Sequence, residues 1–115
     1  MDVHVVRDGS VAIVQPSGEL DLAASPSLRA VMLQACVRHD LTIADLSKVT
    51  FMDSAAVGVL MYCAKRCRRD GHQVRVLNAP ARIVRAMGAL GVTEMLGVNV
   101  GLEDLDEPTR ALLGA

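Results

Sequence analysis

The chain has 115 residues, of which 51% are apolar and only 2% are aromatic. This length fits one domain, residues 1–115, whose core must be built from Val, Leu, Ile, Ala and Met. Twelve basic and 13 acidic side chains give a formal net charge of −1, which does not favour bulk attraction to nucleic acid or to an anionic membrane. The N-terminus shows no signal-peptide pattern, and no apolar run approaches the ~18 residues of a membrane span. We therefore expect a cytoplasmic protein with no membrane insertion and no direct nucleic-acid binding.

The first 21 residues predict two paired strands and an acidic loop. Residues 3–6 and 11–16 are rich in β-branched side chains, and the turn signal Asp8-Gly9 stands between them. The segment Gly18-Glu19-Leu20-Asp21 then leaves the second strand. Glu19 and Asp21 have no His, Cys or Lys beside them that would complete an acid–base site, so we interpret them as solvated loop carboxylates.

Two helices are predicted from start signals and from apolar spacing. Ser25 is the expected N-cap of the first helix and Pro26 its first residue, followed by an apolar face and a short strand over residues 41–46. The second helix covers residues 55–69, with Asp53 or Ser54 as its N-cap. Gly71 suits the left-handed position after this helix. Basic side chains oppose the negative end of its dipole: Lys65, Arg66, Arg68 and Arg69.

The remaining segments complete an alternating pattern. Residues 74–77 predict a strand, and a third helix begins at residues 78–80 and ends at Gly91. A last short strand is expected over residues 95–100, followed by a terminal helix over residues 106–113. The order β-β-α-β-α-β-α-β-α predicts the α/β class, with a mostly parallel central sheet, an N-terminal antiparallel pair and helices packed on the sheet.

The stretch Asp45-Leu46-Ser47-Lys48-Val49-Thr50-Phe51-Met52-Asp53-Ser54-Ala55-Ala56-Val57-Gly58-Val59-Leu60 resembles the signature of STAS domains, specifically of bacterial anti-sigma factor antagonists. Further matches lie at Gly18-Glu19-Leu20-Asp21 and at Leu90-Gly91-Val92, so the resemblance covers nearly the whole chain. The resemblance implies a STAS-type domain in which a partner kinase phosphorylates Ser54. It also implies that Glu19 and Asp21 lie beside that serine and help to contact the partner.

The same resemblance implies a partner-switching function. The unphosphorylated chain would bind an anti-sigma factor, a serine kinase that supplies its own Mg-ATP, and would thereby free the sigma factor. Phosphorylation of Ser54 would end this binding and a phosphatase would restore it. The expected partner-binding residues are Glu19, Asp21, Asp53, Ser54, Ala55, Ala56 and Gly58. We expect no cofactor and no metal, and a monomer or weak homodimer.

Position 56 departs from the family pattern, which usually has glycine two residues after the phosphoserine. The extra methyl group of Ala56 favours a helix by up to ~1 kcal/mol over glycine. The same methyl group would obstruct a kinase that needs to approach the backbone closely. Gly58 matches the family, and it would permit close helix packing or approach by a partner.

The sequence contains no set of residues that predicts an enzyme. The three histidines are scattered with ordinary surface interpretations, and neither a phosphate-binding glycine loop nor a nucleophile elbow is present. Ser54 has no general base close in sequence, so we expect it to be modified by another protein and not to act as a catalytic nucleophile.

The odd number of cysteines does not predict the disulfide framework of a secreted domain. Cys63 and Cys67 are four residues apart on the predicted second helix, where they are poorly spaced for a disulfide with each other. As metal ligands they would need two more partners, and His72 is the only nearby candidate. We interpret the cysteines as small apolar side chains packed in a reducing cytoplasm.

Two other functions remain open. The chain could be a non-switching STAS subunit of a transport ATPase or a signalling scaffold, in which case Ser54→Ala leaves partner binding unchanged. It could also be a redox or ligand sensor that acts through Cys63 and Cys67, in which case oxidant alters binding and Cys63→Ser abolishes the effect.

Overall fold

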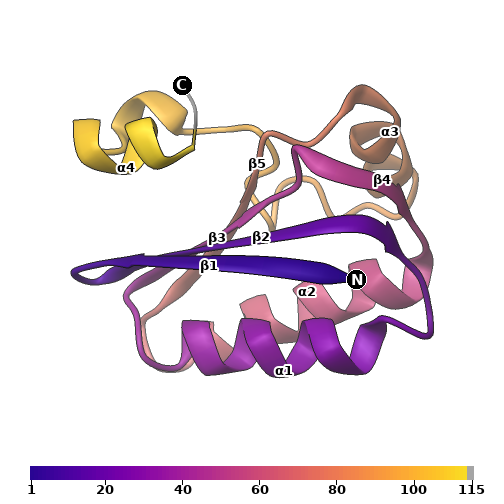
Figure 1. The fold of residues 1–115 in the computed structure, drawn as a ribbon, viewed down its shortest axis with the longest axis horizontal. Helices are drawn as coiled ribbons and strands as arrows, with labels where there is room; N and C mark the ends of the chain where they lie inside the picture. The colour runs from indigo at the N-terminus through magenta and orange to yellow at the C-terminus, as the bar shows by residue number, and fades with distance from the viewer. Residues whose placement is uncertain (114–115) are drawn as a thin grey trace.

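A computed structural model of the chain describes residues 1–113 and shows one mixed β-sheet with helices packed on it (Figure 1). The strands are β1 (Asp2–Asp8), β2 (Val11–Leu20), β3 (Leu41–Asp45), β4 (Lys48–Met52) and β5 (Gln73–Leu77). β1 and β2 are antiparallel and the other pairs are parallel, in the order β1-β2-β3-β5, with β4 also paired to β2. The predicted α/β class, with a mostly parallel sheet and an N-terminal antiparallel pair, is confirmed.

The helices cover both faces of this sheet. α1 (Ser25–Cys36) and α2 (Ser54–Arg68) lie side by side below the sheet in Figure 1, and α4 (Glu107–Leu112) lies above it. α3 (Ala81–Ala89) and the short 3-10 helix η1 (Leu102–Asp104) complete the helical elements of residues 1–113. None of these helices is long and apolar enough to cross a membrane.

Two hydrophobic clusters explain why both faces are covered. The large cluster joins α1, α2 and α3 to one side of the sheet through side chains such as Leu28, Met32, Leu60 and Met87. A smaller cluster on the other side gathers strand residues with residues of the C-terminal segment: Ile13, Ile43, Leu77, Leu105 and Leu113. Because strand side chains alternate between faces, each strand can supply both clusters, as Ile43 and Ala44 do.

The predicted hairpin and the predicted terminal helix are both present. β1 pairs with β2 from Asp2↔Ser17 to Asp8↔Val11, and Gly9 takes a positive φ of 61° in the turn. The side chain of Asp106 caps α4 by accepting a hydrogen bond from the Thr109 backbone N–H at 2.9 Å.

The strand predictions were wrong in two places, one because of backbone conformation and one because of pairing with a distant strand. Residues 95–100 contain no strand, and residues 95–99 form turns, since Gly97 and Asn99 have φ values of 54°. The Asn99 side chain fixes this bend through two hydrogen bonds to the backbone of Ala79, at 2.9 and 3.0 Å. Conversely, residues 48–52 form β4, although the sequence pattern had indicated only a turn into the next helix.

A buried carboxylate ties the C-terminal segment to the sheet. Asp45 is only 1% exposed at the end of β3, and its oxygens accept hydrogen bonds from Gln15 Nε2 at 2.9 Å and from the Ser47 backbone N–H at 3.0 Å. Asn78 Nδ2 donates to Asp45 Oδ1 at 3.3 Å and to the Leu113 carbonyl at 3.1 Å. The first aspartate of the family-like motif therefore has a structural role, because these donors satisfy a charge that burial would otherwise make costly.

Candidate functional site

Ser54 stands at the exposed start of α2, directly after the residue that caps this helix. Asp53 is the N-cap, with extended backbone angles, and its Oδ1 accepts a hydrogen bond from the Ala56 N–H at 3.1 Å. Ser54 is the first helical residue and is exposed. Of the two N-cap candidates, the structure therefore selects Asp53. This leaves the Ser54 hydroxyl with no capping role and close to the positive end of the helix dipole.

Pairing between β2 and β4 brings the acidic segment to the same place. Glu19 lies opposite Phe51 and Leu20 lies opposite Met52 in the parallel register. The Asp53 backbone N–H then donates to the Leu20 carbonyl at 3.1 Å. The expected proximity of Glu19 and Asp21 to Asp53 and Ser54 is thus present. The segment itself differs from the predicted loop, because residues 18–20 are the end of β2 and only Asp21 lies outside the strand.

Asp21 also holds the turn that leads into α1. Its Oδ1 accepts from the Ala24 N–H at 3.0 Å, and its carbonyl accepts from the Ser25 hydroxyl at 3.0 Å. The N-cap position of α1 is Ala24 and makes no side-chain cap, so the prediction that Ser25 caps this helix was wrong. The physical reason is that the Ser25 hydroxyl donates backward to Asp21 and does not accept from the first turn. Glu19 is exposed and has no comparable structural contact among the hydrogen bonds of residues 1–113.

The three small residues after Ser54 have different environments. The Ala56 side chain is 0% exposed and belongs to the main core, whereas Ala55 is half-buried. The methyl group of Ala56 therefore points away from the surface where a kinase would approach, and it does not obstruct that surface. Gly58 is exposed, and a Cβ built on it would meet nothing within 4 Å. Packing within the chain thus gives no reason for a glycine at this helical position.

An apolar groove between α1 and α2 was not predicted from the sequence. It has a volume of about 480 Å³, and Leu22, Pro26, Leu33 and Val59 contribute to its lining. Leu22 is 72% exposed although it is apolar, and Phe51 on β4 is 49% exposed. The available signal was the apolar Leu22 directly after Asp21, but its exposure depends on how the turn is folded.

The site is acidic and open. Glu19 and Asp21 line a second concavity of about 450 Å³ together with the start of α1. The ion pairs found within residues 1–113 join Arg66 to Asp70 and His72 to Asp40, so neither neutralises Glu19, Asp21 or Asp53. Within residues 1–113 the carboxylates of Glu19, Asp21 and Asp53 are therefore not neutralised by an ion pair.

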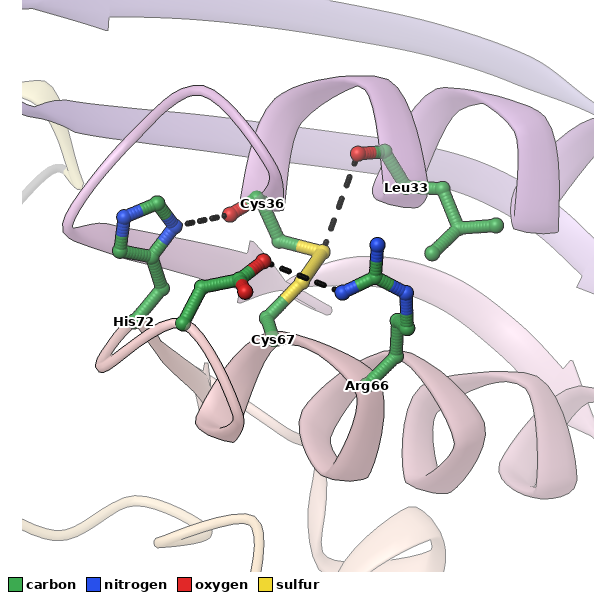
Figure 2. Close-up of polar contacts among 6 residues, drawn as sticks. Leu33, Cys36, Arg66, Cys67 and His72 are labelled. Atoms are coloured by element: carbon green, nitrogen blue, oxygen red, sulfur yellow. Dashed lines mark hydrogen bonds and ion pairs between the residues drawn. A yellow bond between two sulfur atoms is a disulfide. The ribbon is translucent and has the colours of Figure 1, made fainter.

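The cysteines differ from the expectation of three packed thiols. Cys36 and Cys67 form a disulfide between the C-terminal ends of α1 and α2, with Cα atoms 6.1 Å apart (Figure 2). This pair was not predicted from the sequence, because the spacing of Cys63 and Cys67 along one helix does not show which residue of another helix lies opposite. Cys63 is free and buried, and burial raises the pKa of its thiol to about 11.

The histidines, cysteines and acidic residues do not form a metal-binding cluster in the described part of the chain. No three His, Cys, Asp or Glu side chains gather closely enough within residues 1–113 to hold a metal ion. His39 is buried, with its Nδ1 2.8 Å from the Ala35 carbonyl, so the prediction of an ordinary surface histidine was wrong there. His72 Nδ1 lies 2.8 Å from the Cys36 carbonyl and helps to join the ends of α1 and α2.

The fold and the sequence together define a family. The family model described as STAS domain matches residues 2–105, so the chain belongs to the STAS domain family. This finding confirms the resemblance that the segment from Asp45 to Leu60 indicated.

Similar proteins of known name include two bacterial regulators. The chain is 29% identical over 93 residues to the anti-sigma-F factor antagonist RsfA of Mycobacterium tuberculosis, covering 78% of this chain and 73% of the relative. It is 28% identical over 105 residues to an anti-sigma-B factor antagonist of Staphylococcus epidermidis, covering 90% and 96%. Among solved structures, an anti-sigma factor antagonist from Mycobacterium paratuberculosis superposes with a TM-score of 0.78 at 20% identity, covering 90% of this chain and 88% of that one.

Proposed function

We propose that the chain is an anti-sigma factor antagonist of the bacterial cytoplasm, switched by phosphorylation of Ser54. The observation that carries this proposal is the exposed Ser54 hydroxyl at the start of α2, beside Asp53 and the end of β2. The names of the similar proteins support the same function. In this proposal the chain has no catalytic activity of its own, and the anti-sigma factor kinase supplies the Mg-ATP.

The unphosphorylated surface around Ser54 fits a protein partner. It combines the exposed Leu22, the apolar groove between α1 and α2, and the exposed Gly58 that leaves room for close backbone approach. Apolar area supplies affinity, whereas the acidic Glu19 and Asp21 beside it select a partner with complementary charge. Binding at this surface occupies the anti-sigma factor and frees its sigma factor.

Phosphorylation acts on docking and not on the fold. A phosphate adds about −1.5 to −2 charges. The N-terminus of α2 tolerates this negative charge, because the helix dipole is positive there. Within a complex the same phosphate repels Glu19, Asp21 and Asp53 and loses solvation. A loss of ~3 kcal/mol weakens binding roughly 150-fold, at 1.4 kcal/mol per factor of ten. A phosphatase then restores the binding form.

The test compares Ser54→Ala and Ser54→Asp with Ser47→Asp as the matched control. Ser47 is also an exposed serine, and its structural contact uses its backbone N–H, which the substitution keeps. Each tagged protein is used to capture partners from the source cytoplasm, and the captured kinase is purified and titrated with each variant by calorimetry. We expect Ser54→Ala and Ser47→Asp to bind as the wild type does, and Ser54→Asp to bind at least about tenfold more weakly.

A second measurement examines the modification itself. Incubation of the wild type with the purified kinase and Mg-ATP is expected to add one phosphate, detected by intact mass, and Ser54→Ala is expected to receive none. Equal binding by all variants together with no added phosphate would overturn the switch. That outcome would favour the non-switching STAS subunit of a transport ATPase or signalling scaffold.

A further inference from the structure

The Cys36–Cys67 disulfide joins the two helices at the ends that lie farthest from Ser54. Cys36 is the last residue of α1, and Cys67 is in the last turn of α2. Ser54 is the first residue of α2, and the turn held by Asp21 precedes α1. Both helices begin at the right-hand end of Figure 1 and run to the left. One bond therefore links, at their far ends, the two helices that carry the candidate partner surface.

The two bonded sulfurs lie at helix ends. Both side chains are 0% exposed, so a small thiol can react with them only after local opening of the structure. Helix ends open at a lower free energy than the centre of a core. Cys63, which is also 0% exposed, lies one turn deeper in α2 and is not bonded to another cysteine. With its pKa raised to about 11 it stays a protonated thiol near neutral pH, which is a poor nucleophile.

We propose that Cys36 and Cys67 are a reversible oxidation site, and that the state of this site sets how firmly α1 and α2 are held together. In a reducing cytoplasm a protein disulfide is usually transient or redox-sensing. The oxidant is the disulfide of a low-molecular-weight thiol such as glutathione, and the reductant is the corresponding thiol.

Oxidation proceeds by two exchanges that balance. The thiolate of one cysteine attacks a sulfur of the oxidised small molecule, which forms a mixed disulfide and releases one small thiolate. The second cysteine, after losing its proton, attacks the protein sulfur of this mixed disulfide and releases the second small thiolate. The two protein thiols thus lose two electrons and two protons, and one small disulfide becomes two small thiols.

The effect on partner binding rests on the proposed function. Between the two helices the Arg29 guanidinium stacks 4.3 Å from the centre of the Tyr62 ring, and Leu33 and Val59 line the apolar groove. A covalent link at one end of this pair limits how far the helices can separate along the groove. The oxidised form is therefore the better organised docking surface, since less freedom is lost on binding.

The first experiment tests reversibility in native buffer with the wild type and with Cys63→Ala as the matched control. Each protein is exposed to oxidised glutathione and then to excess dithiothreitol, and accessible thiols are alkylated after acid quenching and unfolding. We expect the oxidised wild type to carry one label, at Cys63, and the reduced form to carry three. Peptide mapping is expected to find the bond between Cys36 and Cys67. Reduction that requires a denaturant, or a bond that involves Cys63, would overturn the proposal.

The second experiment tests whether the bond acts on the distant end of α2. Amide hydrogen exchange is measured on the oxidised and reduced wild type, with Cys63→Ala in parallel. We expect reduction to accelerate exchange at least about tenfold in residues 64–69 and also in residues 55–58, in both proteins. Acceleration confined to residues 64–69 would show that the disulfide stabilises only the helix end around it. That result would overturn the proposed effect on the start of α2. Neither measurement uses a partner, so failure of the proposed function would be seen separately in the Ser54 variants.

Discussion

The two ends of the α1–α2 pair are built in opposite ways. At the starts of the helices, Asp21 and Asp53 accept backbone hydrogen bonds, and exposed side chains such as Glu19, Leu22 and Ser54 surround them. At the ends of the helices, a disulfide and the contact of His72 with the Cys36 carbonyl join one helix to the other. The first end is open and acidic, and the second is closed and covalently linked.

This difference follows from the topology of the sheet. α1 follows β2 and α2 follows β4, and these two strands are parallel. Both helices therefore start at the carboxyl ends of parallel strands. Sites in α/β folds usually lie at that edge, where the strands end and loops can vary. Stabilising contacts then gather at the opposite edge, where they do not interfere with a partner.

Removal of the disulfide is expected to give the largest change in stability. The bond spans a sequence separation of 31 residues, and closing a loop of that size contributes about 3.7 kcal/mol in the chain-entropy model. The free energy of unfolding should therefore fall by about this amount when the wild type is reduced, as measured by urea denaturation. Cys63→Ala should show the same difference between its oxidised and reduced forms. Equal stability of the two forms would mean that the closed end does not hold the helices together.

Removal of the Asp53 cap is expected to cost less stability but to act on the open end. Asp53→Ala leaves the Ala56 N–H without its acceptor and should destabilise the chain by about 1 kcal/mol. It should also weaken binding to the captured kinase, because Ser54 then begins a frayed helix. Denaturation and calorimetric titration measure the two effects.

Asp106→Ala is the matched control, since it removes an equivalent cap from α4 on the other face of the sheet. It should leave kinase binding unchanged. Hydrogen bonds from Thr109 hold the pKa of Asp106 below its ordinary value. The stability that this cap contributes is therefore fully present above the ordinary pKa of an aspartate, and it is lost as the pH falls through the lowered pKa. If both variants weaken binding equally, the effect of Asp53→Ala is global and not specific to the site.

Gly58→Ala is expected to give the smallest change in stability, and in the opposite direction. The new methyl group meets nothing within 4 Å, and alanine favours a helix interior over glycine by up to ~1 kcal/mol. The variant should therefore unfold at a slightly higher urea concentration while binding the kinase more weakly, because the partner loses close access to the backbone. Unchanged binding would show that Gly58 is not part of the docking surface.

Much of the site was visible in the sequence because it depends on local rules. Asp53 followed by a segment with helical apolar spacing predicts an N-cap and a helix, and the next residue, Ser54, must then be near the helix start. The segment from Asp45 to Leu60 also identified the family, and the match over residues 2–105 confirmed it. These features need only neighbouring residues and backbone preferences.

The remaining features depend on contacts between distant segments. The strand expected at residues 95–100 is absent because Gly97 and Asn99 have a left-handed backbone. The unpredicted strand β4 forms because it pairs with β2. The burial of the Ala56 methyl group, the exposure of Leu22 and the pairing of Cys36 with Cys67 depend on how the helices pack. The sequence by itself thus determined the family, the α/β class and a helix that starts next to Asp53, whereas the structure chose Asp53 over Ser54 as its N-cap. Only the tertiary structure decided which side chains surround that start and which cysteines meet, because packing sets distances that spacing along the chain does not encode.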